Sequence, residues 1–255
     1  MKQPISRVIV ISDCKDVAFN EIKLIIDKEC RKLGIIGIDI DLVSVEEFSI
    51  INAAFLTRLI AEQCLPNTVL SIIVNPKRSR SERIYGELKG GIIFFGANTG
   101  ALTWLIKDLG LECLYEIKDP GFMSFGGKFV HAPNIAKLIA NVPFDNLGIP
   151  YEESRLTDLD IQKGTILHID NFGLMKIKAE PLKYRNSQGL KIFKNGEYIL
   201  DAVYTNRMMS LEDNAWALYS GSSLNNLPEL GKVRNKNGYL DIAAKIGDII
   251  SWEPT

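Results

Sequence analysis

Polar residues follow two apolar runs of the chain, where a strand would end and a ligand could be met. Asp13 comes directly after the β-branched run Arg7–Ser12, and Asn75-Pro76 ends the run Ser71–Val74. In α/β proteins, strands that stop at such turns present ligand-binding groups at the carboxyl edge of the sheet. The Asp13 carboxylate could accept both hydrogen bonds of a ribose diol, and a simple turn aspartate is an alternative at about even odds. These positions predict one wall of a small-molecule site.

Two nearby loops have compositions that could indicate anion binding, one basic and one containing glycines. The stretch Lys77–Arg83 reads KRSRSER, but it has no interleaved aromatic residues, and a solvated loop is the favoured interpretation over a phosphate or nucleic-acid site. Residues Gly96–Gly100 match neither G-x-G-x-x-G nor G-K-[ST]. We therefore expect a strand end there, with Asn98 or Thr99 capping a helix that runs to Leu109.

The N-terminal half alternates strand and helix patterns that would position these residues. The run Arg7–Ser12 is followed by a helical pattern that Asp16 can cap, and then by a second strand at Gly37–Val43. A capping box at Ser44 predicts a helix to about residue 63, and the strand Thr68–Val74 follows. This β-α-β-α-β order, with short connections, predicts an α/β domain of Rossmann type with a parallel, doubly wound sheet.

The C-terminal half has a different pattern. No convincing element is visible from Asn141 to about residue 162, so the predicted domains are residues 1–157 and 158–255. Short strand-like runs separated by turns follow, which predicts a smaller β-barrel domain. The runs are Thr165–Asp170, Leu174–Ala179, Leu190–Phe193, Tyr198–Tyr204, Ala215–Ser220 and Gly238–Ala244.

Composition excludes several classes of function. Of the 255 residues, 46% are hydrophobic and 24% charged, and the net charge of −1 gives no reason to expect nucleic acid or a membrane as partner. No apolar stretch approaches the roughly 20 residues of a membrane span, and the N-terminus lacks a signal-peptide pattern. The four cysteines form no C-x-x-C pair and the chain has two histidines, so neither a zinc site nor a disulfide framework is indicated. Reduced thiols in the cytoplasm, with no metal, are the expectation.

Several segments resemble one known family over nearly the whole chain. The chain is similar to the S-adenosyl-L-methionine (SAM) hydroxide adenosyltransferases, which are relatives of the SAM-dependent fluorinase and chlorinase. The resemblance is carried by INAAFLTRLI, LPNTVLSIIVNP and GGIIFFGANTGALTWLI, by the segment Gly121–Ala132 before Pro133, and by Ile169–Gly173 and Asn237–Ala243. It implies transfer of the adenosyl group of SAM to water or hydroxide, giving adenosine and methionine. SAM is then the substrate and no cofactor is implied.

The resemblance also implies roles for particular residues. Asp13 would bind the ribose and Asp170 the ammonium of the methionine moiety. Phe172 and Tyr239 would stack on adenine, although core packing is about twice as common for an aromatic residue of a β domain. The carboxylate would meet residues 236–237, so Asn237 and the neighbouring Lys236 are candidates, and Phe125 aligns with a phenylalanine of the family's Phe-His-Gly segment. The family's assembly implies a homotrimer with sites between subunits.

The groups that activate water in this family are largely replaced here. Asn75 stands where the family has aspartate, the arginine position falls on Glu82 or, with a one-residue shift, on Arg83, and the histidine position is Gly126. Asn75 and Arg83 are the catalytic candidates that remain, and His131, at a family phenylalanine position, is interpreted as a packed or surface imidazole. Two functions stay open, a SAM hydrolase with weakened activity and an inactive protein that binds SAM or adenosine. Halogenation is a distant third.

Overall fold

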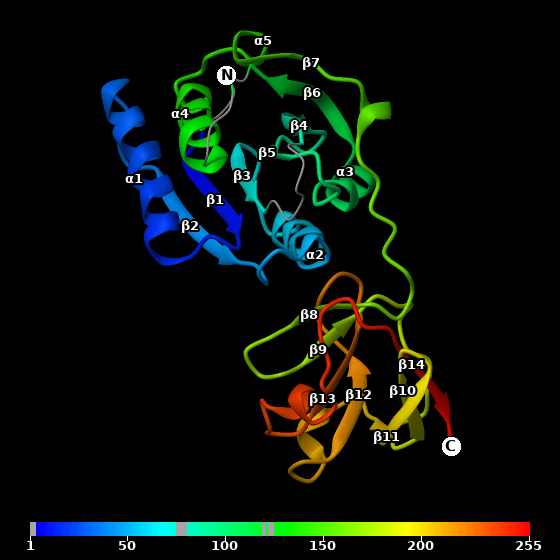
Figure 1. Ribbon diagram of the computed structural model, residues 1–255. Coiled ribbons are helices and arrows are strands. Elements are labelled where there is room, and N and C mark those ends of the chain that lie inside the picture. The colour runs from blue at the N-terminus through cyan, green and yellow to red at the C-terminus, as the bar shows by residue number, and fades with distance from the viewer. Residues whose placement is uncertain (1–3, 75–80, 119–120, 122–124) are drawn as a thin grey trace. The chain divides into compact units, whose positions relative to one another are not determined.

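The structure is a computed structural model that describes residues 4–74, 81–118, 121 and 125–255 (Figure 1). It divides into two compact units, Met1–Leu159 and Asp160–Thr255. Each unit has its own seven-stranded sheet and its own apolar core. Among the described residues, no helix is long and apolar enough to cross a membrane.

The sheet of the first unit is mixed, not parallel throughout. Its strand order is β2-β1-β3-β5-β4-β6-β7, and the first four of these strands are parallel while β4, β6 and β7 run antiparallel to their neighbours. The predicted parallel sheet is therefore confirmed for one half and wrong for the other. The strands are β1 (Arg7–Ser12), β2 (Asp39–Ser44), β3 (Thr68–Ile73), β4 (Arg83–Leu88), β5 (Ile93–Ala97), β6 (Leu111–Ile117) and β7 (Gly148–Pro150).

The direction of β4 and β5 follows from the turn that joins them. The Gly91 N–H donates to the Leu88 carbonyl and the Leu88 N–H to the Ile92 carbonyl, both at 2.8 Å. Gly91 has a positive φ of 76°, which glycine adopts without steric cost. A connection this short can join only antiparallel strands, because a parallel pair needs a crossover of a dozen or more residues.

Helices cover both faces of this sheet (Figure 1). On one face α1 packs beside α4, and the cluster beneath them joins Val8 and Val10 of β1 to Ile22 and Ile26 of α1. On the other face α2 contacts β1, β3 and α3. Because β1 is buried from both sides, its run of β-branched residues is explained. The helices are α1 (Asp16–Lys32), α2 (Ile50–Ala61), α3 (Thr103–Leu109), α4 (Ala132–Ile139) and α5 (Phe144–Leu147).

Two predicted helix starts are wrong. Ser44 is the last residue of β2, in register with Ser12, so its capping box is not used. Helix α2 begins at Ile50 instead, with the Ser49 hydroxyl accepting the Asn52 N–H at 3.2 Å. Neither Asn98 nor Thr99 caps α3, which begins at Thr103 after the N-cap residue Leu102. At Ser44 and at Asn98, tertiary hydrogen bonding overrides a local capping pattern. The predicted cap of α1 is wrong as well, because Asp16 is the first residue of that helix and follows the N-cap residue Lys15.

The second unit is a curled half-barrel, so the predicted β-barrel domain is confirmed in part. Its strand order is β14-β10-β11-β12-β13-β9-β8, and the sheet curls so that a bridge between Thr165 and Ile249 joins its two ends. The strands are β8 (Ile166–Ile169), β9 (Met175–Ile177), β10 (Gly189–Lys194), β11 (Glu197–Tyr204), β12 (Trp216–Ser220), β13 (Pro228–Lys232) and β14 (Ile250–Pro254).

The prediction missed β13 and β14 and misread one segment. The predicted strand at Gly238–Ala244 is instead the short helix α6 (Gly238–Asp241), which contacts β13. Strand β13 reads PELGK, and its proline and glycine mask it because both residues are depleted in strands.

Candidate functional site

A cavity of about 310 Å³ lies at the carboxyl ends of the parallel strands in the first unit. Residues after β1, at the end of β3 and at the end of β5 contribute to its wall, and so does the start of β4, which runs the other way and pairs Arg83 with Ala97. Ligands of open α/β sheets bind at this edge. The lining residues are Asp13, Cys14, Phe48, Ile72, Ile73, Val74, Arg83, Ala97, Phe125, Gly126, Gly127 and His131.

Asp13 is held in this cavity by the backbone around it. The Ser12 hydroxyl donates to the Ile73 carbonyl at 2.7 Å and accepts the Cys14 N–H at 2.9 Å, which ties the end of β1 to the end of β3. One Asp13 carboxylate oxygen, Oδ2, accepts the Phe48 N–H at 3.0 Å. A carboxylate has about four acceptor positions, so this bond leaves capacity for a ligand hydroxyl. The geometry of Asp13 therefore fits both interpretations, that of a turn residue and that of a hydrogen-bond acceptor for a ligand.

Arg83, not Glu82, faces the cavity. Arg83 is the first residue of β4 and lines the cavity wall. Glu82 is exposed and lies 3.4 Å from the Arg155 guanidinium in an ion pair outside the cavity. The guanidinium offers five N–H donors and stays charged at all accessible pH values. The sequence left two positions for the family arginine, Glu82 and Arg83. Of these two residues, Arg83 lines the cavity.

The segment from Gly126 to His131 contributes Gly126, Gly127 and His131 to the cavity wall and contains an unusual helical turn. Residues Gly127–His131 form one π-helical turn, closed by a bond from the Ala132 N–H to the Gly127 carbonyl, and continue directly into α4. The helix thus begins earlier than expected from Pro133. Such turns are rare and occur preferentially at functional sites.

Gly126 lies against Arg83, and His131 is close enough to feel the charge of Arg83. A Cβ atom at Gly126 would be 2.5 Å from Nη2 of Arg83, so a side chain there requires the guanidinium to move. The His131 imidazole is 3% exposed, and its Nδ1 is buried without a hydrogen-bond partner in the described part of the chain. Burial, and then the charge of Arg83, lower the pKa of His131 to about 3. This imidazole is neutral at physiological pH.

Phe125 and Cys14 also line this cavity, whereas Asn75 lies outside the described residues. Phe125 is half-buried, lines the cavity and packs against the core beneath α1 and α4. Asn75 and the first part of the Lys77–Arg83 loop lie outside the described residues. The Cys14 thiol also lines the cavity, but burial raises its pKa, which keeps it protonated and disfavours a nucleophilic role.

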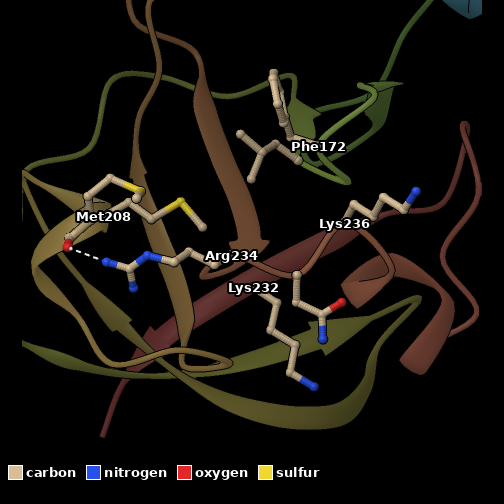
Figure 2. Close-up of a pocket in the computed structure, with 8 residues that line it drawn as sticks. Phe172, Met208, Lys232, Arg234 and Lys236 are labelled. Atoms are coloured by element: carbon tan, nitrogen blue, oxygen red, sulfur yellow. Dashed lines mark hydrogen bonds between the residues drawn. The ribbon is translucent and has the colours of Figure 1, made fainter.

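The second unit has a cavity of about 450 Å³ with a cationic and thioether lining (Figure 2). Figure 2 shows Phe172 and Lys236 on one side and Met208 on the other, with Arg234 between them donating a 3.4 Å bond to the Met209 carbonyl. The lining residues are Phe172, Leu174, Met208, Met209, Lys232, Arg234, Asn235 and Lys236. Phe172 is 66% exposed, so its ring is available to a flat partner.

The cations of this second cavity are only partly neutralised. The Lys232 ammonium lies 2.7 Å from Asp241, and Arg234 pairs with Asp213. For Lys236, no ion pair is found within the described ranges of the chain. An exposed ammonium at this rim attracts an anionic group such as a carboxylate.

The other predicted residues of this unit lie around the second cavity and not in its lining. The Asp170 Oδ1 accepts the N–H groups of Phe172 at 2.9 Å and Leu174 at 3.0 Å, so Asp170 shapes the turn that presents Phe172. Asn237 is exposed and its N–H binds the Asn235 side chain at 3.0 Å. Tyr239 is half-buried and packs against the core of the half-barrel, which agrees with the packing interpretation weighed for it.

Some lining residues were not singled out from the sequence. The pair Met208-Met209 lies at a short 3-10 turn, and adjacent methionines are a usable signal because flexible, polarisable side chains suit binding surfaces. Phe48 could not be identified as a lining residue from the sequence. Its position in the cavity wall depends on a left-handed backbone conformation, with φ of 60°, and on the hydrogen bond from its N–H to Asp13. Among the described residues, no group of three or more His, Cys, Asp or Glu side chains is arranged to hold a metal ion.

The fold and these cavities define the class of protein. It is an α/β protein with a polar and aromatic cavity at the carboxyl edge of its sheet, followed by a half-barrel unit. The chain belongs to the SAM hydroxide adenosyltransferase family, because the model of that family's N-terminal domain matches residues 8–148. The resemblance inferred from the motifs is thereby confirmed.

Individual comparisons give one more distant relative and two solved structures that share the fold. The chain is 27% identical over 161 residues to the (R)-S-adenosyl-L-methionine hydrolase of Methanocaldococcus jannaschii, a match covering 60% of this chain and 59% of that relative. Two crystal structures share the fold over 97% of this chain. One is an uncharacterized conserved protein from Thermotoga maritima (18% identity, all of that chain, TM-score 0.82). The other is a conserved hypothetical protein from Thermus thermophilus (16% identity, 99% of that chain, TM-score 0.75).

Proposed function

We propose that this protein binds SAM and transfers its adenosyl group to water or hydroxide, releasing adenosine and L-methionine. The observation that carries the proposal is the overlap of two findings. The residues that match the family's N-terminal domain are the residues that build the cavity around Asp13 and Arg83. The sulfonium of SAM is already a good leaving group, so the protein needs mainly to align a water with C5′ and exclude other water.

In this proposal the binding groups come from both units. Asp13 accepts hydrogen bonds from the ribose diol, and Phe125 contacts the nucleoside. Asp170 and Asn237 serve the methionine end, while Phe172 and Tyr239 supply aromatic surface for adenine. Each complete site forms between the first unit of one subunit and the second unit of its neighbour in a homotrimer. Light scattering tests the assembly, and a stable monomer near 28.5 kDa would contradict it.

A protein that binds SAM or adenosine without turnover is the second candidate. It is favoured by the glycine at position 126 and by asparagine at position 75, which leave a weaker water-activating set than the family pattern. Losing a positioned acid or base typically lowers a rate by about 10²- to 10⁴-fold while binding remains. Binding and turnover must therefore be measured separately.

Calorimetric titration with SAM and with adenosine tests binding, and chromatographic detection of adenosine after incubation with SAM tests turnover. Asp13→Asn is the sharpest variant, because the amide oxygen can still accept the Phe48 N–H that the carboxylate accepts at 3.0 Å. Loss of the charge-assisted bond to the ribose should weaken binding by about 10-fold or more, since such bonds contribute about 1.5–3 kcal/mol.

Asp39→Asn is the matched control, because Asp39 is an exposed aspartate at the start of β2, outside the cavity lining. It should bind both ligands like the unmodified protein. Absence of heat with either ligand, in protein shown to be folded by circular dichroism, would end the proposal.

A further inference from the structure

We propose that the half-barrel of the second unit binds an extended peptide segment with an acidic side chain, which adds to the sheet as a strand beside β14. The place is a third cavity, of about 360 Å³, whose lining includes Lys163, Gly164, Ala179, Tyr184, Ile250 and Trp252. None of its lining residues lines either cavity described above, and none is assigned to SAM. The inference is therefore independent of the proposed function.

The two ends of the curled sheet meet over only part of their length. Strands β8 and β14 are its terminal strands, and the Ile250 N–H donates to the Gly164 carbonyl, just before β8, at 2.8 Å. From there β14 continues to Pro254, and within the described ranges of the chain its only paired strand is β10. One edge of β14 is therefore open beyond Ile250.

The backbone of Trp252 points toward this open edge. Along a strand, the backbone groups of successive residues point alternately to one side and to the other. Since the Ile250 N–H bonds to Gly164 and not to β10, Trp252 also directs its N–H and carbonyl away from β10. Thr255, at the opposite phase, donates to the Gly189 carbonyl of β10 at 3.1 Å. Among the described residues, the Trp252 N–H and carbonyl have no hydrogen-bond partner.

The other border of the opening also has unpaired backbone. Ala179 and Tyr184 line the cavity from the segment that follows β9. For residues 179–184, no backbone hydrogen bond is found within the part of the chain that the structure describes. Open strand edges add extended peptides because main-chain hydrogen bonds supply affinity and pockets for alternate side chains supply specificity. A strand in this opening would pair with Trp252 on one side and face residues 179–184 on the other.

The lining sets the chemistry of the occupant. Tyr184 and Trp252 are half-buried and pack against the core of the half-barrel, so they offer apolar surface to every second side chain of an added strand. The one charged side chain among the described lining residues is Lys163, which is exposed. No ion pair of its ammonium is found in the described ranges. An acidic side chain of the peptide would complement this charge.

A second copy of this chain is a less suitable occupant of the edge than a separate peptide. Pro254 is the next residue after Trp252 whose backbone faces away from β10, and proline has no N–H to donate. In a symmetric pair of β14 strands, both copies would lack this bond. A peptide with a complete set of N–H groups lacks only the bond that Pro254 cannot donate.

A display library of random heptapeptides tests the proposal, panned on the full-length protein and counter-selected on Trp252→Pro. This change removes the N–H at the open edge and none that bonds to β10, and edge strands tolerate proline at such positions. We expect the enriched heptapeptides to alternate apolar residues and to contain Asp or Glu. By fluorescence anisotropy, the affinity of an enriched, fluorescein-labelled heptapeptide should fall about 10-fold or more in Trp252→Pro.

Charge variants test the acidic preference. Lys163→Glu should weaken binding of the same heptapeptide by about 3- to 5-fold, because exposed ion pairs contribute little each. Lys191→Glu is the matched control, since Lys191 is an exposed lysine of β10 outside the cavity lining, and it should leave the affinity unchanged. Equal affinities for the two charge variants would overturn the assignment of an acidic side chain to the peptide.

Two other outcomes would overturn the peptide site itself. One is that no heptapeptide is enriched on the unmodified protein over Trp252→Pro. The other is a smaller assembly of Trp252→Pro than of the unmodified protein in light scattering, because a second copy would then occupy the edge. If Trp252→Pro does not fold, as judged by thermal melting, Ala179→Trp fills the opening from its other border, and unchanged heptapeptide binding by that variant would overturn the proposal. SAM binding and adenosine release should be the same in all these variants, so the proposed function is tested separately.

Discussion

The buried imidazole of His131 makes the stability of the first unit depend on pH. In the folded protein its pKa is about 3, whereas an unperturbed histidine in the unfolded chain has a pKa of about 6.5. Between these values the unfolded chain binds a proton that the folded protein does not, so stability is lost as pH falls from about 7 toward 3. At pH 5 the unfolded imidazole is protonated by about 30 to 1, which corresponds to a loss of about 2 kcal/mol relative to pH 8.

Urea unfolding at pH 8 and pH 5 measures this loss. Trp104 lies in the first unit and Trp216 and Trp252 in the second, so replacing the latter two with Phe leaves a fluorescence reporter for the unit of interest. In that background, His131→Phe should lose about 2 kcal/mol less stability between pH 8 and pH 5 than the parent. His168→Phe, in the other unit, is the matched imidazole control and should leave the transition of the first unit unchanged. The same pH dependence with and without His131 would refute the reasoning.

Two further predictions concern the half-barrel. Lys176→Met removes the ammonium 2.5 Å from Glu229, whose side chain is 5% exposed. The buried carboxylate then keeps the Tyr219 hydroxyl as a donor but has lost its cation, which should destabilise the second unit by about 3 kcal/mol in urea unfolding. A loss below about 1 kcal/mol would mean that the Tyr219 bond alone is enough for this carboxylate. Asp170→Ala removes the acceptor of the Phe172 and Leu174 N–H groups and should cost about 1–2 kcal/mol and weaken adenosine binding in calorimetry, whereas Asp170→Asn should retain most of both. Unchanged adenosine affinity in Asp170→Ala would show that this turn does not serve the ligand.

The sequence predicted those parts of the site that depend on strand ends. A β-branched run that stops at a polar residue defines a buried strand and its carboxyl edge, and Asp13 lies where that pattern indicates. The parallel half of the sheet followed from the same patterns. The antiparallel half did not, because the direction of β4 relative to β5 depends on the turn at Gly91, which an alternation of apolar residues does not specify.

Other features depend on interactions distant in sequence. The Asn98 side chain was assigned to a helix cap, but its amide donates to Tyr151 at 3.0 Å and its oxygen accepts the Thr157 N–H at 2.7 Å. The orientation of His131 is set by a π turn, and no residue pattern in that segment distinguishes a π turn from an α turn. Long-range hydrogen bonding and helix type therefore account for much of what was missed.

Because Gly126 approaches Arg83 closely, the size of the residue at position 126 and the place of the Arg83 guanidinium depend on each other. A Cβ atom at 126 would lie 2.5 Å from Nη2 and 2.6 Å from Nε of Arg83, so no larger residue can enter while the guanidinium keeps its present place. The crowded atoms are the far end of a flexible side chain, so a residue with a Cβ atom at 126 would enter together with a movement of Arg83. A substitution at 126 would therefore change where this cavity carries its positive charge.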